Sequence, residues 1–223
     1  MIRLFDILFS ILGILILGPI LIIVIILLKF TGEGKVFFLQ DRIGKNYKVF
    51  KIIKFATMLK DSPNIRTGTI TVKNDPRVLP LGKLLRKTKI NELPQLFNVI
   101  KGDMSLIGPR PLTNKEFFKH SEINQKIISN VLPGLSGVSS IIFVNEEELL
   151  FENNRKLYEE KIIHVKGSLE TWFVKNKKTS LYFALILFTI ISIISSKNKL
   201  IYRFYSSIPN FDKNLALSQE KLT

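Results

Sequence analysis

Residues 7–28 read ILFSILGILILGPILIIVIILL and contain no charged side chain. This stretch is longer than the roughly 20 apolar residues that an α-helix needs to cross the hydrocarbon core of a bilayer. It has neither the shorter apolar core nor the small-residue cleavage site of a secretory signal peptide. The sequence therefore predicts a membrane anchor that stays attached to the chain, and we place it at residues 1–30.

The anchor is interrupted in its middle by Gly18 and Pro19. Proline has no backbone N–H and its ring clashes with the preceding turn, so the helix should kink or break there. Two topologies follow from the residues: a kinked helix that spans the bilayer, and a re-entrant helix-break-helix that enters and leaves by the same face. The basic remainder of the chain is expected on the cytoplasmic side.

The charge balance points to an anionic partner. The 223 residues include 33 Lys and Arg against 18 Asp and Glu, for a formal net charge of +15, and there is no Cys. The lack of Cys excludes disulfides, thiolate nucleophiles and Cys-based zinc sites. A basic protein can bind nucleic acid, an acidic membrane or a phosphorylated substrate. We exclude nucleic acid as the partner, because the chain has no recognisable nucleic-acid motif and a membrane anchor has no use there.

A second apolar run covers residues 181–194 and is shorter than a comfortable span. Lysines flank it on both sides, and they can lie near anionic headgroups. We therefore predict that residues 179–223 form an apolar interfacial or shallow membrane helix followed by a tail, with a second span as the alternative. Trp172, just before this region, is predicted to be an interfacial anchor.

The soluble body between the apolar runs covers residues 31–178. Residues 36–50 are typical of two short strands around a turn at 44–46, and residues 51–60 either extend the strand or begin a helix. Residues 61–80, with three prolines and a glycine, predict a long ordered loop, and such loops are usually functional. The expected fold class is α+β, mostly helical with a small β-hairpin.

The most informative part of the body is residues 84–102, LLRKTKINELPQLFNVIKG. Apolar side chains recur at helical spacing from Leu93 to Ile100. Asn91 can serve as N-cap, Pro94 fits the first turn and Gly102 can end the helix. The sequence therefore predicts a short helix that begins at Asn91.

Two features near this helix suggest phosphate binding. Glu92 would lie in the first turn, directly after the basic residues Arg86, Lys87 and Lys89, where the helix N-terminus favours phosphate oxygens. The alternative is that Glu92 only complements the helix dipole. Further on, Arg110 stands between two prolines that each fix φ, so its guanidinium can grip a phosphate in bidentate fashion with little loss of freedom.

Three segments together resemble one family. They are the interrupted anchor, residues 74–111 (NDPRVLPLGKLLRKTKINELPQLFNVIKGDMSLIGPRP) and residues 132–137 (LPGLSG). Over about residues 1–195 the chain resembles the bacterial sugar transferases, the monotopic phosphoglycosyl transferases. The resemblance implies transfer of a sugar 1-phosphate from a nucleotide diphosphate sugar, expected to be a UDP-sugar, to polyprenyl (undecaprenyl) phosphate. This step begins polysaccharide or glycoconjugate synthesis at the cytoplasmic face of the bacterial inner membrane.

The resemblance also implies an active site and a topology. The family's anchor is re-entrant and broken at a Ser-Pro pair, which here is Gly18-Pro19. An Asp-Glu pair carries the chemistry with magnesium, and its Glu matches Glu92, the implied catalytic residue and metal ligand. The implied phosphate and substrate ligands are Lys54, Arg86, Arg110 and Pro111. Residues 141–151 resemble a longer version of a region that we expect to contribute to sugar or nucleotide choice, the alternative being a solvated helix.

The chain departs from the family at two positions. Asn91 stands where the family has the attacking Asp, and Ala56 stands where the family usually has Arg. A carboxamide is a poor nucleophile and a weaker magnesium ligand than a carboxylate, although Asn caps a helix about as well as Asp. Three expectations follow: an active transferase that uses Glu92 as nucleophile or direct attack by the lipid phosphate, a slowed transferase, or a catalytically silent membrane partner or scaffold.

Overall fold

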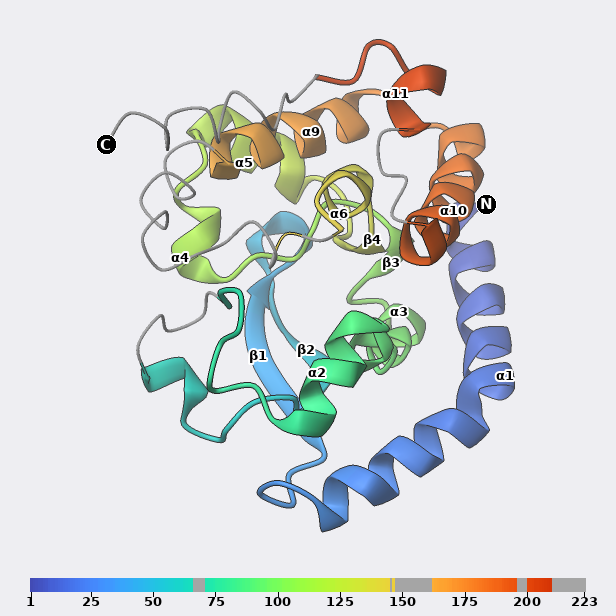
Figure 1. Ribbon diagram of the computed structural model, residues 1–223. Helices are drawn as coiled ribbons and strands as arrows, with labels where there is room; N and C mark the ends of the chain where they lie inside the picture. Colours follow the sequence, from blue (N-terminus) through green and yellow to red (C-terminus); the bar gives the residue numbers. More distant parts are fainter. Residues whose placement is uncertain (66–70, 145, 147–161, 196–199, 210–223) are drawn as a thin grey trace.

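A computed structural model describes residues 1–65, 71–144, 146, 162–195 and 200–209. Figure 1 shows helices arranged around a long two-stranded hairpin, with the N-terminal helix α1 along one side of the body. The described part of the chain is mostly helical with two small sheets, which agrees with the predicted α+β class. Of residues 141–151, which we expect to contribute to sugar or nucleotide choice, the structure describes 141–144 and 146.

Helix α1 (Ile2–Phe30) continues through Pro19 instead of breaking there, and Figure 1 shows it bent about midway. Of the two outcomes expected at this position, a kink or a break, the structure shows the kink. Gly18 and Pro19 lie where no other part of the body crowds the helix, so the loss of one hydrogen bond is absorbed by bending. Among the described helices, α1 is long and apolar enough to cross a membrane.

The N-terminal end of α1 is fastened to the body by polar contacts. The buried carboxyl group of Asp6 accepts hydrogen bonds of 2.9 Å from the Ser105 hydroxyl, the Leu106 backbone N–H and the Tyr182 hydroxyl. Arg3 donates to the carbonyl of Ile100 at 2.9 Å. This end of an otherwise apolar helix is therefore held by residues from three later segments of the chain.

The C-terminal half of α1 is fastened by apolar packing. Leu21, Val24 and Leu28 are buried in one cluster with Phe55 and Leu85. Burial of each such side chain contributes roughly 1.5–3 kcal/mol. The opposite face of α1 is apolar and exposed along its whole length, from Leu4 and Leu8 to Leu27 and Phe30.

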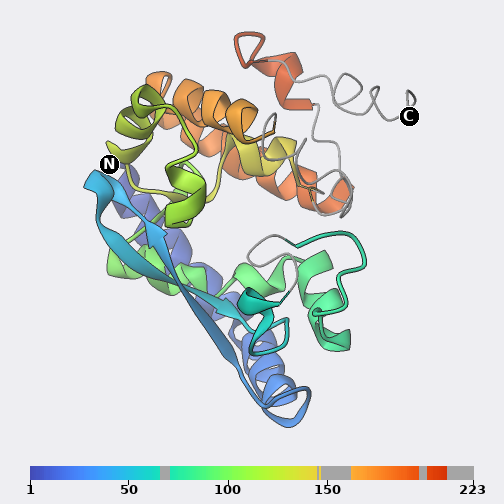
Figure 2. The same cartoon turned by 90° about the vertical axis from the view of Figure 1, so that its left-hand side faces the viewer.

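The predicted hairpin is confirmed. Strands β1 (Phe37–Ile43) and β2 (Val49–Phe55) pair antiparallel from Phe37↔Phe55 to Ile43↔Val49 around a 3-10 turn, η1 (Lys45–Tyr47). The turn is tight because Asn46 has a left-handed φ of 54°. Residues 51–55 extend the strand, which decides between the two alternatives for that segment. Figure 2 shows the hairpin running the length of the body beside α1.

After the hairpin, the short 3-10 helix η2 (Ser62–Asn64) lies in the loop predicted at residues 61–80. The loop is ordered around a buried ion pair in which Arg77 donates to Asp75 at 2.6 Å and to the carbonyl of Ser62 at 2.7 Å. Helix α2 (Pro80–Lys87) follows, and Arg86 lies in its last turn. Residues 66–70 of the predicted loop lie outside the described residues.

The helix predicted to begin at Asn91 begins four residues later. Ile90–Glu92 forms a 3-10 turn, η3, and α3 covers Gln95–Lys101 with Pro94 at the N-cap position. The prediction was wrong because an N-cap side chain binds the N–H two or three residues on. The N–H of Leu93 donates to the Ile90 carbonyl at 3.1 Å instead, and Pro94 has no N–H. Gly102 ends α3 as expected, with a left-handed φ of 100°.

A small parallel sheet, which the sequence did not reveal, brings the two glycine-rich motifs together. Strand β3 (Ser105–Ile107) pairs with β4 (Gly134–Ser136), and helices α4 (Asn114–Phe117) and α5 (Glu122–Ser129) lie between them in the chain. The backbones behind these strands touch, since a Cβ on Gly134 would lie 2.1 Å from the backbone nitrogen of Gly108. Only glycine allows this approach, and it fixes the start of the Pro109-Arg110-Pro111 segment.

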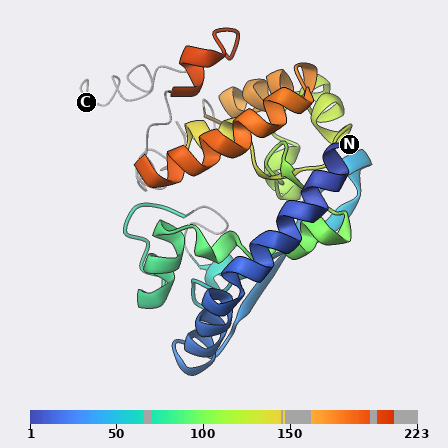
Figure 3. The same ribbon diagram turned by 90° about the vertical axis from the view of Figure 1, so that its right-hand side faces the viewer.

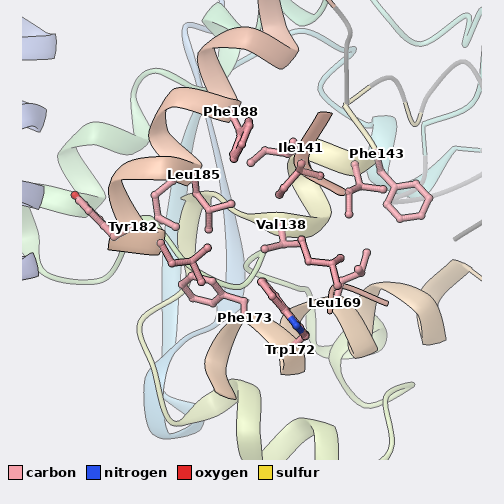
Figure 4. Packing of buried hydrophobic residues seen from close by; sticks show 14 of the residues in the cluster. Val138, Ile141, Phe143, Leu169, Trp172, Phe173, Tyr182, Leu185 and Phe188 are labelled. Atoms are coloured by element: carbon pink, nitrogen blue, oxygen red, sulfur yellow. The ribbon is translucent and has the colours of Figure 1, made fainter. Parts of the chain in front are cut away.

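The largest apolar core joins the C-terminal helices. It is formed by α6 (Val138–Ile142), α9 (Ile163–Lys175), α10 (Thr179–Ser195) and α11 (Leu200–Phe204), and Figure 4 shows its side chains interleaving. Trp172 belongs to this core and its indole N–H donates to the Ser207 hydroxyl at 3.2 Å, so the interfacial role predicted for it was wrong.

Helix α10 has two faces. Leu181, Tyr182 and Leu185 are buried in the core, whereas Leu187 and Ile194 are exposed. Figure 3 shows α1 and α10 crossing the same side of the molecule and diverging from a point near the N-terminus. There, Phe5 of α1 packs edge-on against Phe183 of α10 with ring centroids 5.0 Å apart. The two apolar helices thus lie on one face of the body.

Candidate functional site

A cavity of about 170 Å³ opens between the hairpin, α2 and the η3 turn. Its lining is strongly basic, with Lys35, Arg42, Lys54, Lys60, Arg86, Lys89 and Arg110. Glu92 is the one carboxylate among its described lining residues, and Asn91 lies beside it. The cavity therefore brings together five of the six residues that we singled out from the sequence: Lys54, Arg86, Asn91, Glu92 and Arg110.

Glu92 is held as a carboxylate by a cation from the hairpin. Lys54, on β2, donates to Glu92 Oε1 at 2.7 Å. Burial raises the pKa of Glu92, but attraction by Lys54 and Arg110 outweighs it and lowers that pKa to about 2. Burial lowers the pKa of Lys54 to about 8, against the opposing effect of Glu92. Glu92 is therefore negative, and Lys54 mostly positive, at neutral pH.

Asn91 lies next to Glu92 with its side chain 6% exposed. Its Oδ1 atom is buried and, within the described residues, accepts no hydrogen bond. A buried acceptor without a donor costs free energy. The amide occupies the place that the resemblance assigns to a nucleophile.

Arg86 reaches the cavity from the last turn of α2. Its guanidinium donates to the Thr71 hydroxyl at 2.8 Å and to the Thr57 hydroxyl at 3.3 Å. Helix α2 can approach Thr57 so closely because residue 82 is Gly, where a Cβ would lie 2.1 Å from the Thr57 carbonyl oxygen. Neighbouring Lys87 is exposed and does not line the cavity.

Arg110 lies at the boundary of the cavity, where the glycine contact behind β3 has placed it. Burial lowers the pKa of its guanidinium, but the nearby carboxylates, Glu92 foremost, raise that pKa above its ordinary value. Its backbone N–H donates to Glu170 Oε1 at 3.1 Å. The guanidinium is therefore a permanent cation on a backbone that is fixed on both sides.

Pro111 is the sequence-predicted ligand that does not line the cavity. It is buried, and its carbonyl accepts a hydrogen bond of 3.0 Å from Arg42. Arg42 also pairs with Glu116 at 3.3 Å and itself lines the cavity. Pro111 therefore reaches the site only through Arg42, a residue that the sequence reasoning missed. The period-two alternation of Phe38, Gln40 and Arg42 on a predicted strand was the signal that could have found it.

Glu170, from α9, is the second residue that the sequence reasoning missed. It is 3% exposed and accepts hydrogen bonds from the Ser139 hydroxyl and the Arg110 backbone. Burial raises its pKa to about 7, more than these neutral donors lower it. No local pattern marks this residue, because it meets Arg110 only after the chain has folded.

These features define a class of protein: one with a strongly basic cavity, suited to an anionic ligand, beside two apolar helices that each expose one face. Residues 1–196 match the family model described as bacterial sugar transferase. The chain belongs to the bacterial sugar transferase family.

Curated relatives agree with this assignment. The chain is 46% identical over 108 residues to the exopolysaccharide production protein PSS of Rhizobium leguminosarum bv. phaseoli, which covers 48% of the chain and 54% of that protein. It is 43% identical over 109 residues (49% of the chain, 20% of the relative) to the undecaprenyl-phosphate glucose phosphotransferase of Komagataeibacter xylinus. It is 39% identical over 140 residues (61% of the chain, 33% of the relative) to the UDP-N-acetylgalactosamine-undecaprenyl-phosphate N-acetylgalactosaminephosphotransferase of Aeromonas hydrophila. The chain thus matches about half the length of the first relative and a third or less of the others.

Proposed function

We propose that this protein transfers a sugar 1-phosphate from a nucleotide diphosphate sugar to polyprenyl phosphate, as an early membrane step of polysaccharide or glycoconjugate synthesis. The observation that carries the proposal is the ring of cations Lys54, Arg86 and Arg110 around the single carboxylate of Glu92 in one cavity. A diphosphate and a monophosphate that approach each other bring several negative charges together. Fixed cations in a partly enclosed site stabilise that arrangement without reorganisation.

The reaction exchanges one phosphorus–oxygen bond for another. A nucleophilic oxygen attacks the β-phosphorus of the donor, the bond to the bridging oxygen breaks, and the electron pair leaves with the nucleoside monophosphate. The nucleophile is either the acceptor phosphate or Glu92, which would first form an acyl phosphate and then pass the phosphosugar to the lipid. Neither route needs a base, because both nucleophiles are already ionised near neutral pH.

Magnesium is part of the proposal as an ion that enters with the donor. Asn91 Oδ1 and the Glu92 carboxylate are oxygen ligands of the kind that magnesium prefers, and Asn91 Oδ1 has no other described partner. Within the described residues no group of three or more His, Cys, Asp or Glu is placed to hold a metal, so donor phosphates would complete the coordination. When bound, the ion would neutralise charge on the donor diphosphate.

One assay tests the activity. Purified protein in nanodiscs receives undecaprenyl phosphate, magnesium and each of a panel of UDP-sugars, and release of uridine monophosphate is measured. We expect release with at least one donor. Radiolabelled donor separates the routes: a phosphosugar adduct on the protein supports Glu92 as nucleophile, and turnover without an adduct favours direct transfer. If no nucleotide sugar gave either turnover or an adduct, the proposal would be contradicted. The remaining reading would then be the silent membrane partner.

Asn91→Asp sharpens this test. A carboxylate beside Glu92 should bind magnesium more tightly and restore the nucleophile that the family resemblance implies. We expect turnover to rise by at least tenfold and an adduct to form on the new carboxylate, as measured by uridine monophosphate release and peptide mapping. A decrease in turnover, in protein that is shown to be folded, would contradict the alignment of Asn91 with that nucleophile.

We further propose that α1 is re-entrant and that the body faces the cytoplasm from the inner membrane. Arg3 and Asp6 bind the body at one end of α1, and Leu21, Val24 and Leu28 pack on it at the other. A helix that spans the bilayer would carry one of these ends to the far side, out of reach of the body. The exposed apolar face between them is suited to enter one leaflet.

Accessibility labelling tests the topology. Tags placed before Met1 and after Gly34 should both be protected in sealed right-side-out spheroplasts. Pro19→Leu restores a backbone donor and removes the clash, and should move the first tag toward the outside. Labelling of the first tag in the parent protein would contradict the re-entrant arrangement.

A further inference from the structure

A second cavity, of about 270 Å³, adjoins the basic one. The two cavities share Lys89, Glu92 and Arg110 in their linings, so they meet at the carboxylate and the clamped guanidinium. Away from this meeting point most of the lining side chains are apolar, and the polar ones are four hydroxyl residues and Glu146, whose carboxylate pairs with Lys166. The pair of cavities thus has one polar junction with a basic chamber on one side and an apolar chamber on the other.

One wall of the apolar chamber is a stripe of helix α10. Ile186, Thr189, Ile190 and Ile193 line the chamber, and this spacing places them on one face of the helix. Ile190 and Ile193 are half exposed, at 51% and 46%. The wall therefore continues without interruption into the apolar surface that α10 shows to solvent.

The opposite wall connects the chamber to helix α1. Leu93 lines the chamber and also packs against the cluster that contains Leu21 and Leu28 of α1. Because α1 and α10 lie on the same face of the molecule, as Figure 3 shows, the chamber lies between the two helices that expose the most apolar surface. A ligand that enters from the side of these helices passes apolar walls before it meets a charge.

We propose that the apolar chamber receives the phosphate-proximal isoprene units of the polyprenyl phosphate acceptor, with its phosphate between Lys89 and Arg110. This inference rests on the proposed function and adds the place of one substrate. The chamber is too small for a whole polyprenyl chain, so the distal units leave the chamber for the bilayer. The donor diphosphate then occupies the basic chamber, and the two phosphates meet at Glu92.

The chamber suits a hydrocarbon better than the sugar of the donor. A sugar site needs polar groups that are free to bond hydroxyls. Here the hydroxyls of Ser136 and Thr189 bond each other at 2.7 Å, and the Ser192 hydroxyl donates to the Thr189 carbonyl. These three hydroxyls are therefore already paired, as is the carboxylate of Glu146 with Lys166, and an apolar chain takes no hydrogen bond from them.

Two matched double variants of α10 test the placement in nanodiscs that contain undecaprenyl phosphate. Ile190→Gln with Ile193→Gln changes the chamber wall. Leu187→Gln with Ile194→Gln changes neighbouring exposed side chains that do not line the chamber. The first should raise the KM for undecaprenyl phosphate on the order of tenfold, with kcat and the donor KM unchanged. The second should keep all three values within about twofold of the parent.

Acceptors of two chain lengths extend the test. Only the first isoprene units fill the chamber, so the wall variant should raise the KM for farnesyl phosphate and the KM for undecaprenyl phosphate by a similar factor. Equal effects of the two double variants would overturn the placement, because they would reflect membrane contact alone. A rise in the donor KM instead of the acceptor KM would also overturn it and assign the chamber to the sugar.

Photolabelling separates failure of this placement from failure of the proposed function. A farnesyl phosphate with a diazirine in its first isoprene unit should label peptides from α10 and the residues around Leu93, and undecaprenyl phosphate should compete. This readout requires no turnover, so it holds even if every donor fails in the activity assay. Labelling spread over the exposed face of α1, or unaffected by the competitor, would overturn the placement.

Discussion

Two carboxylates, Glu92 and Glu170, lie near Arg110, and their protonation differs. Glu92, on the η3 turn, has its pKa lowered to about 2, and Glu170, on α9, has its pKa raised to about 7. Both are desolvated, so burial alone cannot explain the difference. Glu92 receives a cation, Lys54, at 2.7 Å, whereas Glu170 receives the Ser139 hydroxyl and a backbone N–H.

The comparison separates two functions of an acidic residue near Arg110. Glu92 stays charged, and its charge gathers cations that a phosphate can share. Glu170 titrates near neutrality and supports the backbone of Arg110 from behind. We therefore expect Glu92 to take part in the chemistry and Glu170 to support the fold around it.

The largest effect is expected for Glu92→Gln. The amide keeps the size of the side chain but loses the charge, and turnover should fall at least a thousandfold in the uridine monophosphate assay. Asp41→Asn, which changes an exposed carboxylate on β1, should leave turnover unchanged. Parent-like turnover of Glu92→Gln would mean that the active site lies elsewhere.

The loss of Glu92 also leaves Lys54 without its partner, which can cost about 3–5 kcal/mol of stability. The double variant Glu92→Gln with Lys54→Met removes both charges and should recover most of that stability. It should remain inactive. Circular dichroism and thermal unfolding distinguish this result from simple misfolding.

Arg110→Lys should reduce kcat/KM by roughly 10- to 100-fold. It keeps the charge and the backbone bond to Glu170 but removes the planar fork that grips two phosphate oxygens. The same exchange at Arg203, an exposed residue of α11, should have no effect on turnover. Full activity of a folded Arg110→Lys protein would show that the guanidinium makes no bidentate contact.

The pH profile tests the Lys54–Glu92 side of the comparison. Lys54 is a cation below its pKa of about 8 and neutral above it, so kcat/KM should fall as the pH rises past 8, approaching tenfold per pH unit. Glu92, with a pKa of about 2, stays ionised over the whole accessible range. Lys54→Arg should move the alkaline limb to higher pH, and an unmoved limb would assign it to another group.

The smallest effect is expected for Glu170→Gln and concerns stability. The folded-state pKa of Glu170 is raised above its ordinary value of 4.5, so its favourable contribution is complete below about pH 4.5 and is lost as the pH rises through about 7. The side chain of the variant cannot titrate. Its free energy of unfolding relative to that of the parent should therefore rise by on the order of 1–3 kcal/mol between these pH values. Thermal unfolding at pH 5 and pH 8 measures the difference. An equal change at both pH values would contradict the assignment.

The parts of the fold that the sequence predicts are those with local causes. The hairpin follows from apolar alternation around Gly44, and the end of α3 follows from Gly102. The start of α3 was misjudged because Pro94 removes the N–H that Asn91 would need to cap. Trp172 was misplaced because a single amphipathic ring fits a membrane interface and a protein core equally well, and only tertiary packing decides.

The candidate site divides in the same way. Lys54, Arg86, Glu92 and Arg110 were found because they lie in or beside motifs that resemble a family. Arg42 and Glu170 were not found, since their positions relative to Arg110 come from strand pairing and from helix packing across the fold. Asn91 was found as a departure from the family pattern, but the unpartnered state of its oxygen became visible only in three dimensions.

The hydrogen bonds of Asp6 have a consequence for the order of biosynthesis. Asp6 leaves the ribosome 176 residues before Tyr182, one of its donors. At about 5–20 residues per second, this separation corresponds to a delay of roughly 10–35 seconds. During that time the carboxyl group lacks this donor, and a carboxyl group in an apolar segment disfavours deep insertion. The N-terminal end of α1 therefore receives its last hydrogen bond only when α10 arrives, so truncation before α10 should weaken the attachment of this end to the body.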